Sequence, residues 1–437
     1  MEKIDINKFF IKLSSKVIAG ENMLLSKNKN LFSPDNWPTY YKKAKGCYIW
    51  DLNGKKYIDM CLMGVGTNIL GYAVNSIDKK VIASIKNSNM STLNCSEEVM
   101  LAKELLKINS WADQVRFART GADASSIAIR LSRAFTKKDK IILCGYHGWH
   151  DWYIASNLKK KNLNQHLFPN LNTKGVPKIF SNLIYSIEYG DIKSFLQIIK
   201  NDIQIGTVIM EISRNKKIDL NFLKIIRRET VKKGITLIFD ECTSGFRENF
   251  GGLHKKINIF PDLVTFGKAL GNGYAITAVL GKKKIMNTFS DTFISSTFWT
   301  ERSGYVAALE TLRIMKKTKP WLGIIKKGIK IKENWKKLSE KYSVPIKIFG
   351  LDAIPSFSFE NKENNLIYKT FLTQEFLKKN ILASNMIYIS TAHKKKHIDK
   401  YFYNLEKIFK TISSSPLTVI KKKIFGRICF NSMARMN

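Results

Sequence analysis

The segment LVTFGKALGNGY, residues 263–274, ends an apolar run in Lys268 and continues into a glycine-rich turn. Most lysines of this chain lie among other polar residues, whereas Lys268 has apolar and glycine neighbours. An amine in a partly apolar site can act as a nucleophile toward a carbonyl carbon. Taken alone, however, the segment fits an ion-paired lysine, or one whose amine reaches solvent, better than it fits a nucleophile.

A second segment, ITLIFDECTSGFR, ends another apolar run in Asp240 and Glu241. Such a run is typical of a central strand that is buried on both faces. A carboxylate buried there costs several kcal/mol unless a cation or hydrogen-bond donors compensate it. The pattern therefore predicts an acid with a cationic partner, and the alternative is an acid that caps a helix or loop.

The segment RTGADASSIAIR, residues 119–130, places Gly121 between an expected strand and a helix that should begin near Asp123. A glycine followed by the unpaired N–H groups of a helix can hold a phosphate group. An ordinary strand-to-helix turn with a helix cap explains the same residues equally well.

Aromatic and imidazole side chains crowd the segment LCGYHGWHDWY, residues 143–153. The spacing of His147 and His150 would suit a metal ion, but no matching cluster of ligands occurs elsewhere among only six histidines. We therefore expect no metal. The remaining alternatives are aromatic rings that pack beneath a loop and a ring that stacks on a flat cofactor.

These segments are joined by an alternation of strand-like and helical patterns. Strands are expected at residues 114–120, 140–146, 207–213, 235–241, 262–268 and 276–282, with amphipathic helices between them. This order predicts an α/β domain with a mainly parallel sheet. Because ligands bind at the carboxyl ends of parallel strands, the four segments should converge at one edge.

Together the four segments would supply a phosphate cradle, an aromatic face, a buried acid and an amine. Pyridoxal 5′-phosphate (PLP) needs this combination, because the amine attaches the cofactor and the acid keeps the pyridine nitrogen protonated, so that the ring can accept electrons. The sequence therefore predicts a PLP site.

The segments DECTSGFR and PDLVTFGKALGNG resemble the signature of class-III, fold type I, PLP-dependent aminotransferases. The chain is most similar to glutamate-1-semialdehyde 2,1-aminomutase and its relatives, and GCYIWDLNGKKYIDM, TGADASSIAIRLSRAF, GYHGWHDWY, SSTFWTERSG and ISTAH follow in family order. The resemblance implies a fold type I PLP transferase. It also implies that Lys268 is the Schiff-base lysine, that Asp240 pairs with the pyridinium nitrogen, and that backbone groups of Gly121 and Ala122 hold the phosphate.

The same resemblance implies four further cofactor contacts. Tyr146 matches the aromatic residue that stacks on the ring, and Cys242 matches the residue on the opposite face, where the family usually has valine. Thr297 matches a threonine that reaches the phosphate from the neighbouring subunit, which implies a homodimer with shared active sites. Glu211 matches a glutamate near the cofactor, although Ile212 replaces the usual proline.

One departure bears on the reaction. Aminomutases of this family have a glutamate eight residues before the histidine of the S-x-A-H segment, and here that position is Asn385. The expected function is therefore that of an aminotransferase or aminomutase-like enzyme, which moves an amino group between a donor and an aldehyde or keto substrate. The alternative is a true glutamate-1-semialdehyde 2,1-aminomutase. Analogy alone suggests a sugar or cell-surface precursor as substrate.

The formal net charge is +38 in a chain of 437 residues. The lysines occur in pairs and triples along the whole chain and are not concentrated in an arm with arginine and aromatic residues, so we attribute them to surface composition. A basic nucleic-acid-binding protein without catalysis is the disfavoured alternative. The charge should still attract anionic substrates.

The six cysteines are widely separated, which is typical of free thiols in a reducing compartment. With no secretory signal and no membrane-spanning run visible, we expect a cytoplasmic protein. Three regions are expected: an N-terminal arm with part of the small domain (1–75), a large PLP-binding domain (76–315) and a C-terminal α+β region (316–437). The smaller α+β domain would then be built from both chain termini.

Overall fold

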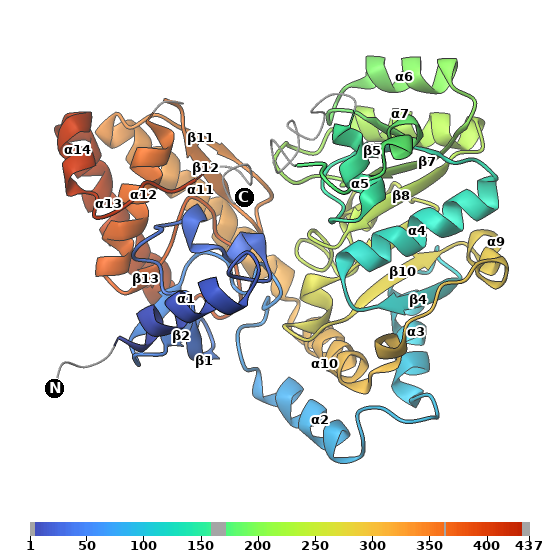
Figure 1. Cartoon of the computed structure of the whole chain (residues 1–437), viewed down its shortest axis with the longest axis horizontal. Helices are drawn as coiled ribbons and strands as arrows, with labels where there is room; N and C mark the ends of the chain where they lie inside the picture. The colour runs from blue at the N-terminus through green and yellow to red at the C-terminus, as the bar shows by residue number, and fades with distance from the viewer. Residues whose placement is uncertain (1–4, 159–171, 362–363, 431–437) are drawn as a thin grey trace. The chain divides into compact units, whose positions relative to one another are not determined.

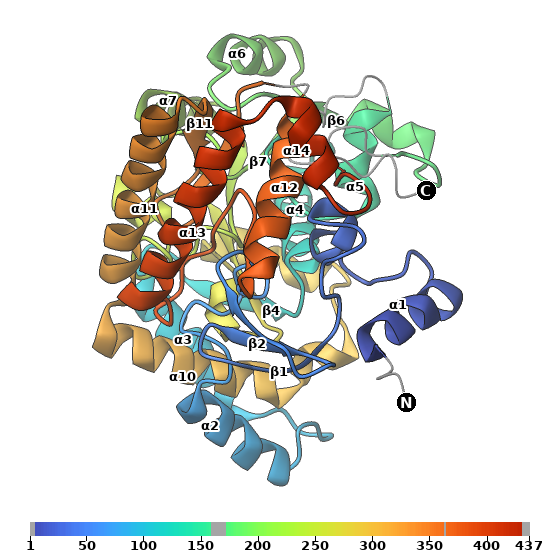
Figure 2. The same ribbon diagram turned by 90° about the vertical axis from the view of Figure 1, so that its left-hand side faces the viewer.

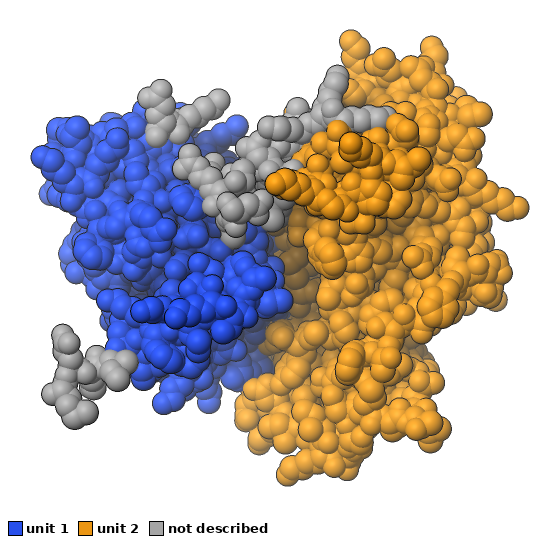
Figure 3. Space-filling view, in the orientation of Figure 1, with its two compact units in different colours: residues 1–74, 322–437 blue, residues 75–321 orange. Residues whose placement is uncertain are grey.

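The computed structural model describes residues 5–158, 172–361 and 364–430. The chain forms two compact units, one of residues 1–74 with 322–437 and one of residues 75–321, coloured separately in Figure 3. The first unit therefore combines segments from both halves of the sequence.

The unit of residues 75–321 is built on a seven-stranded sheet with the order β4-β10-β9-β8-β7-β5-β6 (Figure 1). Its strands are β4 (Gln114–Ala118), β5 (Lys140–Cys144), β6 (Ile184–Ser186), β7 (Ile205–Met210), β8 (Thr236–Glu241), β9 (Leu263–Phe266) and β10 (Thr277–Gly281). β10 pairs with β4 and β9 in antiparallel fashion, and the other pairs of this sheet are parallel. The mainly parallel α/β sheet predicted from the sequence is confirmed.

The central strands of this sheet are buried along their whole length, as their uninterrupted apolar runs predict. Helix α4 (Gly121–Thr136) packs across them, and its Ile127 and Leu131 share a core with Ile209 and Ile238 of the sheet. The other helices of the unit are α2 (Asn75–Lys86), α3 (Ser96–Ile108), α5 (Asp151–Ile154), α6 (Ile192–Asn201), α7 (Leu220–Lys232), α8 (Leu253–Ile257), α9 (Lys283–Met286) and α10 (Arg302–Thr318). Helix α4 thus fixes the loop at its start to the sheet.

Residues 302–342 form two helices, α10 and α11 (Pro320–Tyr342). Helix α10 ends because Lys319 adopts the left-handed conformation at its C-cap. Pro320 then begins α11, where its missing N–H group costs nothing.

The unit of residues 1–74 and 322–437 contains two small sheets. The first has the order β1-β2-β3-β13, with strands β1 (Tyr41–Lys45), β2 (Tyr48–Asp51), β3 (Lys56–Asp59) and β13 (Ile381–Leu382). β2 and β3 form a hairpin, whose turn contains Gly54 at φ 83°. The second sheet pairs β11 (Ile346–Phe349) with β12 (Ser356–Phe359).

The same unit also contains α-helices. They are α1 (Ile6–Val17), α11, α12 (Asn365–Lys378), α13 (Lys395–Ser414) and α14 (Leu417–Lys423). Of these helices, α12 packs against β12 and β13. Helix α12 packs against both α13 and α14 (Figure 2). The apolar stripe of α13, with Tyr401, Leu405 and Phe409, is buried as its helical spacing predicts.

Candidate active site

Lys268 follows β9 after one residue, Gly267, and begins a short 3₁₀ turn, Lys268–Gly271. Its backbone is left-handed, with φ 41°, a conformation that is uncommon for a residue with a side chain. Its Nζ donates a hydrogen bond to Thr243 Oγ1 at 3.0 Å. The amine is thus held by a hydroxyl group of the loop that follows β8.

Asp240 lies in β8, opposite Thr265 of β9, and is 5% exposed. His147 Nδ1 lies 2.9 Å from Asp240 Oδ2, and Oδ1 accepts hydrogen bonds from the Cys242 N–H and the Thr265 hydroxyl, both at 3.0 Å. Burial opposes ionisation of this carboxyl group, but the hydrogen bond and charge of His147, the Cys242 N–H and the Lys268 charge outweigh it and hold the pKa below its usual value. Asp240 is therefore an ionised acid at pH 7.

Glu241, the next residue of β8, points to the opposite face of the sheet, because side chains alternate along a strand. Its carboxylate accepts hydrogen bonds from the N–H groups of Leu253 and His254, and it lies 2.5 Å from His254 Nδ1. Of the two acids at the end of this strand, Asp240 is the one placed near Lys268.

The two histidines of the aromatic segment have different partners. His147 lies on Asp240, while His150 Nδ1 lies 2.6 Å from Ser126 Oγ of α4. Within residues 5–158, 172–361 and 364–430, no group of three or more His, Cys, Asp or Glu side chains is placed to hold a metal ion. The crowding of this segment is explained by the hydrogen bond from His147 to the buried acid and by ring contacts among Tyr146, Trp152 and Tyr153.

Helix α4 begins at Gly121, two residues earlier than expected, with Thr120 as its N-cap. The Thr120 hydroxyl accepts a hydrogen bond from the Asp123 N–H at 3.2 Å. The N–H groups of Gly121 and Ala122 have no acceptor among the described residues. Gly148 lies so close that a Cβ atom there would sit 2.7 Å from Ala122 Cβ. These two N–H groups can receive an anion.

Three further candidate residues lie at the same edge of the sheet. Glu211 accepts a hydrogen bond from the Tyr146 N–H at 3.0 Å, and Arg214 Nη1 lies 3.2 Å from its other oxygen. Cys242 lies between two glycines, since its Sγ would be 3.4 Å from a Cβ at Gly121 and 3.5 Å from one at Gly267. Burial raises the pKa of the Cys242 thiol, so the thiol stays protonated.

Thr297 is exposed and begins the 3₁₀ turn Thr297–Thr300. Arg119 holds this turn in place by donating hydrogen bonds to the Phe298 and Trp299 carbonyl oxygens, both at 3.0 Å. Among the described residues, no hydrogen bond joins Thr297 to another candidate site residue. The structure of one chain thus brings seven of the eight candidates to one edge of the sheet and leaves Thr297 at the surface.

The sequence analysis missed several residues of this network. Thr243 joins Lys268 to Arg214, whose Nη1 lies 3.5 Å from the same hydroxyl oxygen. Thr265 could have been found, because it lies in the expected strand 262–268 that ends in Lys268. The contact between His147 and Asp240 could not, because it joins a loop to a strand end 93 residues away in the sequence.

The comparisons with known proteins can be set against this geometry. The family model described as aminotransferase class-III matches residues 32–409. The chain belongs to this family. It is 33% identical over 354 residues to a 3-aminobutyryl-CoA aminotransferase of Cloacimonas acidaminovorans, covering 79% of this chain and 81% of that protein. It is 30% identical over 376 residues to a glutamate-1-semialdehyde 2,1-aminomutase of Methanococcus maripaludis, covering 83% and 84%.

Solved structures share the fold of this class-III aminotransferase. The PLP internal aldimine form of the FumI protein of Sphingopyxis sp. MTA144 gives a TM-score of 0.83 at 24% identity, covering 95% of this chain and 99% of that one. An omega-transaminase of Sphaerobacter thermophilus gives a TM-score of 0.82 at 20% identity, covering 94% and 98%. The resemblance to the class-III, fold type I aminotransferases is therefore confirmed.

Class-III aminotransferases are PLP-dependent enzymes, and the residues of this site fit the cofactor. The unpaired N–H groups of Gly121 and Ala122 suit its phosphate, the ionised Asp240 suits a protonated pyridine nitrogen, and Lys268 supplies the amine.

No helix in the described parts of the chain is long and apolar enough to span a membrane.

Proposed function

We propose that this chain is an aminotransferase in which Lys268 attaches PLP and carries the proton, while Asp240 holds the pyridine nitrogen in its protonated form. The observation that supports the proposal most is the position of the two groups. The Lys268 amine contacts Thr243 and the Asp240 carboxylate contacts the Cys242 N–H, so the loop that follows β8 joins both groups.

In the proposed site, each residue has one task. The N–H groups of Gly121 and Ala122 bind the phosphate, Tyr146 and Cys242 contact the two ring faces, and Thr243 orients the lysine amine. PLP supplies an electron sink that stabilises negative charge at the substrate carbon. With PLP and an amino donor bound, the Lys268 amine would serve as general base and acid, accepting the proton from that carbon and returning it later in the reaction.

Asp240 performs its task because it is ionised and buried. A carboxylate whose pKa is held low remains negative beside a protonated ring nitrogen, and in a dry site the attraction between the two is strong. Glu211 and Arg214 form an ion pair beside Tyr146. We propose that this ion pair holds Tyr146 in position for ring stacking, because Glu211 accepts a hydrogen bond from the Tyr146 N–H.

Two observations favour an aminotransferase over an aminomutase. Asn385 occupies the position of the glutamate that aminomutases keep, and its amide donates to the Phe357 carbonyl oxygen at 2.7 Å. The Asn385 side chain is thus engaged in a hydrogen bond to the backbone. It also carries no negative charge that could pair with a substrate amine. Aminomutase relatives that are 30% and 31% identical over most of the chain keep a mutase as the second candidate.

We further propose a homodimer in which Thr297 of one chain reaches the phosphate held by the other. The exposed position of Thr297, on a turn fixed by Arg119, is consistent with a contact made in trans. We also propose that the protein works in the reducing environment of the cytoplasm, because all six cysteines are free thiols. Small-molecule amino donors and carbonyl acceptors are the expected substrates.

The test begins with borohydride reduction of the purified protein with PLP, followed by peptide mass spectrometry. We expect the cofactor to be fixed on Lys268. The Lys268→Ala variant should lose both this label and all turnover, whereas Lys283→Ala, which removes an exposed lysine of α9, should keep both. Turnover by Lys268→Ala, or a label on another lysine, would refute the assignment.

A second experiment separates the two reactions. A transaminase consumes an amino donor and a carbonyl acceptor and releases a separate keto product, whereas a mutase converts one substrate into its isomer without an acceptor. We expect the amino donors that react with the enzyme to release a keto product in stoichiometric amount. Isomerisation of glutamate-1-semialdehyde without an acceptor would establish the mutase instead.

A further inference from the structure

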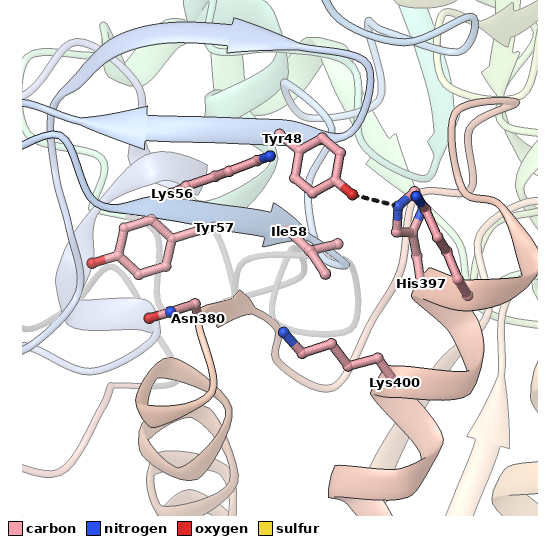
Figure 4. A pocket seen from close by; sticks show the side chains of 8 residues that line it. Tyr48, Lys56, Tyr57, Ile58, Asn380, His397 and Lys400 are labelled. Carbon is pink, nitrogen blue, oxygen red and sulfur yellow. Dashed lines mark hydrogen bonds between the residues drawn. The ribbon is translucent and has the colours of Figure 1, made fainter.

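The unit of residues 1–74 and 322–437 contains a pocket that has no part in the proposed reaction. It has a volume of about 480 Å³ and is formed by the β2–β3 hairpin and the first turns of α13 (Figure 4). The residues that matter for its chemistry are Tyr48, Lys56, Ile58, Lys396, His397 and Lys400. All of them lie in one unit, and none belongs to the site around Lys268.

The lining of this pocket carries positive charge without a compensating acid. Lys56, Lys396 and Lys400 have no carboxylate partner among the described residues, and no acidic side chain lines the pocket. In contrast, the neighbouring Lys395 pairs with Asp399 at 2.7 Å. Three unpaired ammonium groups around one concave surface repel each other, and a bound anion would relieve this repulsion.

Lys56 is the lysine of this pocket whose amine is positioned by aromatic rings. Lys56 Nζ lies 4.0 Å from the centre of the Tyr48 ring and 5.1 Å from that of Trp50, a cation–π arrangement. Figure 4 shows the Lys400 amine directed from α13 toward Ile58 of β3. Amines from a hairpin and a helix that are far apart in sequence thus border the same pocket.

A buried histidine fixes the direction of a further donor. His397 is 4% exposed, and its Nδ1 accepts a hydrogen bond from the Lys394 N–H at 3.1 Å. Burial and the charge of Lys396 lower the pKa of His397, so the ring is neutral and carries its proton on Nε2. Nε2 lies 2.9 Å from the Tyr48 hydroxyl oxygen and donates to it. The Tyr48 hydroxyl hydrogen is therefore available to a ligand.

We propose that this pocket binds a small molecule with a phosphate or pyrophosphate group, whose oxygens contact Lys56, Lys396 and Lys400 and accept a hydrogen bond from Tyr48. Lysine binds phosphoryl groups as a point charge, and three ammonium groups together suit the multiple negative charge of a phosphate or pyrophosphate. The volume suits a small ligand, since such sites span roughly 300–1,000 Å³.

The test uses the enzyme loaded with PLP, so that the phosphate cradle of α4 is occupied. Isothermal titration calorimetry measures the binding of inorganic phosphate, pyrophosphate and ADP, with citrate as a carboxylate probe of comparable charge. The pocket variant is Lys396→Gln/Lys400→Gln. The matched control is Lys421→Gln/Lys422→Gln, which removes the same charge from exposed lysines of α14 outside the pocket. Tyr48→Phe removes the hydroxyl donor and, with it, the acceptor of the His397 Nε2 proton.

We expect pyrophosphate to bind the wild-type enzyme and the control with equal affinity, and the pocket variant about tenfold or more weakly. Tyr48→Phe should weaken binding by a smaller factor. ADP binding more tightly than pyrophosphate would show that a nucleoside also occupies the pocket, while equal affinity would assign the site to the phosphoryl group alone.

Three results would overturn the proposal. The first is the absence of binding by the wild-type enzyme at about 1 mM ligand. The second is equal weakening in the pocket variant and the α14 control, which would indicate general surface charge. The third is citrate binding as tightly as pyrophosphate, which would show that the pocket does not select a phosphoryl group. None of these results depends on the aminotransferase activity.

Discussion

His147 donates its Nδ1 proton to Asp240, with Nδ1 and Oδ2 2.9 Å apart. The direction of the bond follows from the acid, because an ionised carboxylate only accepts. His147 Nε2 is buried and has no hydrogen-bond partner among the described residues. Among the described residues, the histidine thus has one hydrogen bond, to the acid that we assign to the cofactor.

This relationship predicts that His147→Phe lowers the free energy of unfolding of the cofactor-free protein by about 1–3 kcal/mol at pH 7. Asp240 would remain buried with one donor fewer, so its pKa would rise. Urea unfolding of wild type, His147→Phe, Asp240→Asn and the double variant measures the coupling. Because the amide introduced by Asp240→Asn carries no charge, the His147 change should cost less in that background. If His147→Phe lowered the free energy of unfolding equally with Asp240 and with Asn at that position, the contact between His147 and Asp240 would not contribute to stability.

Much of this site could be predicted from the sequence, because each part is marked by a recognisable pattern of neighbouring residues. Apolar runs that end in Asp240 and in Lys268 mark two strand ends, and parallel strands bring such ends together. The antiparallel direction of β10 has no such signal, since its apolar run TAVLG would be the same in either direction. Strand β6 has only three residues, which is too short to show a periodicity.

Contacts between loops remained outside the reach of the sequence for a different reason. The hydrogen bonds from His147 to Asp240 and from Lys268 to Thr243 depend on the relative positions of loops, and residue types alone do not fix those positions. The charged pocket beside α13 was also missed, because its lysines come from segments that are far apart in the chain. Because lysines occur along the whole sequence, the clustering of three of them around this pocket is visible only in the folded chain.

A second prediction concerns the approach of Gly148 to Ala122. Gly148 has φ 114°, and a Cβ atom there would lie 2.7 Å from Ala122 Cβ and 3.0 Å from its Cα. Gly148→Ala should therefore displace the start of α4 and weaken the binding of PLP about tenfold or more, because the phosphate donors move. Fluorescence titration of the cofactor-free protein measures this affinity. Gly190→Ala, at φ 93° with only a distant contact at 4.0 Å, is the control for backbone strain without a clash. Equal affinities of the two variants would contradict the prediction.

A third prediction concerns acid stability and His393. This ring is 1% exposed, accepts a hydrogen bond from the Ser390 N–H at Nδ1 and donates from Nε2 to the Asp59 carbonyl oxygen at 2.7 Å. Burial lowers its pKa from 6.5 to about 4. The unfolded chain therefore binds a proton between these two values and the folded chain does not. The free energy of unfolding is therefore unaffected by protonation of His393 above pH 6.5, and it decreases as the pH falls toward 4.

Lowering the pH from about 7.5 to about 5 should thus remove about 2 kcal/mol from the free energy of unfolding through His393 alone. His393→Gln, which cannot titrate, should lose less stability than wild type over this interval, and urea unfolding at the two pH values measures the difference. Ser390→Ala is the matched control, because it removes the hydroxyl that donates to the Ile69 carbonyl oxygen and keeps the titrating ring. That control should be less stable than wild type at both pH values and show the same dependence on pH. If His393→Gln also showed the wild-type dependence, the buried ring would not be the source of the acid sensitivity.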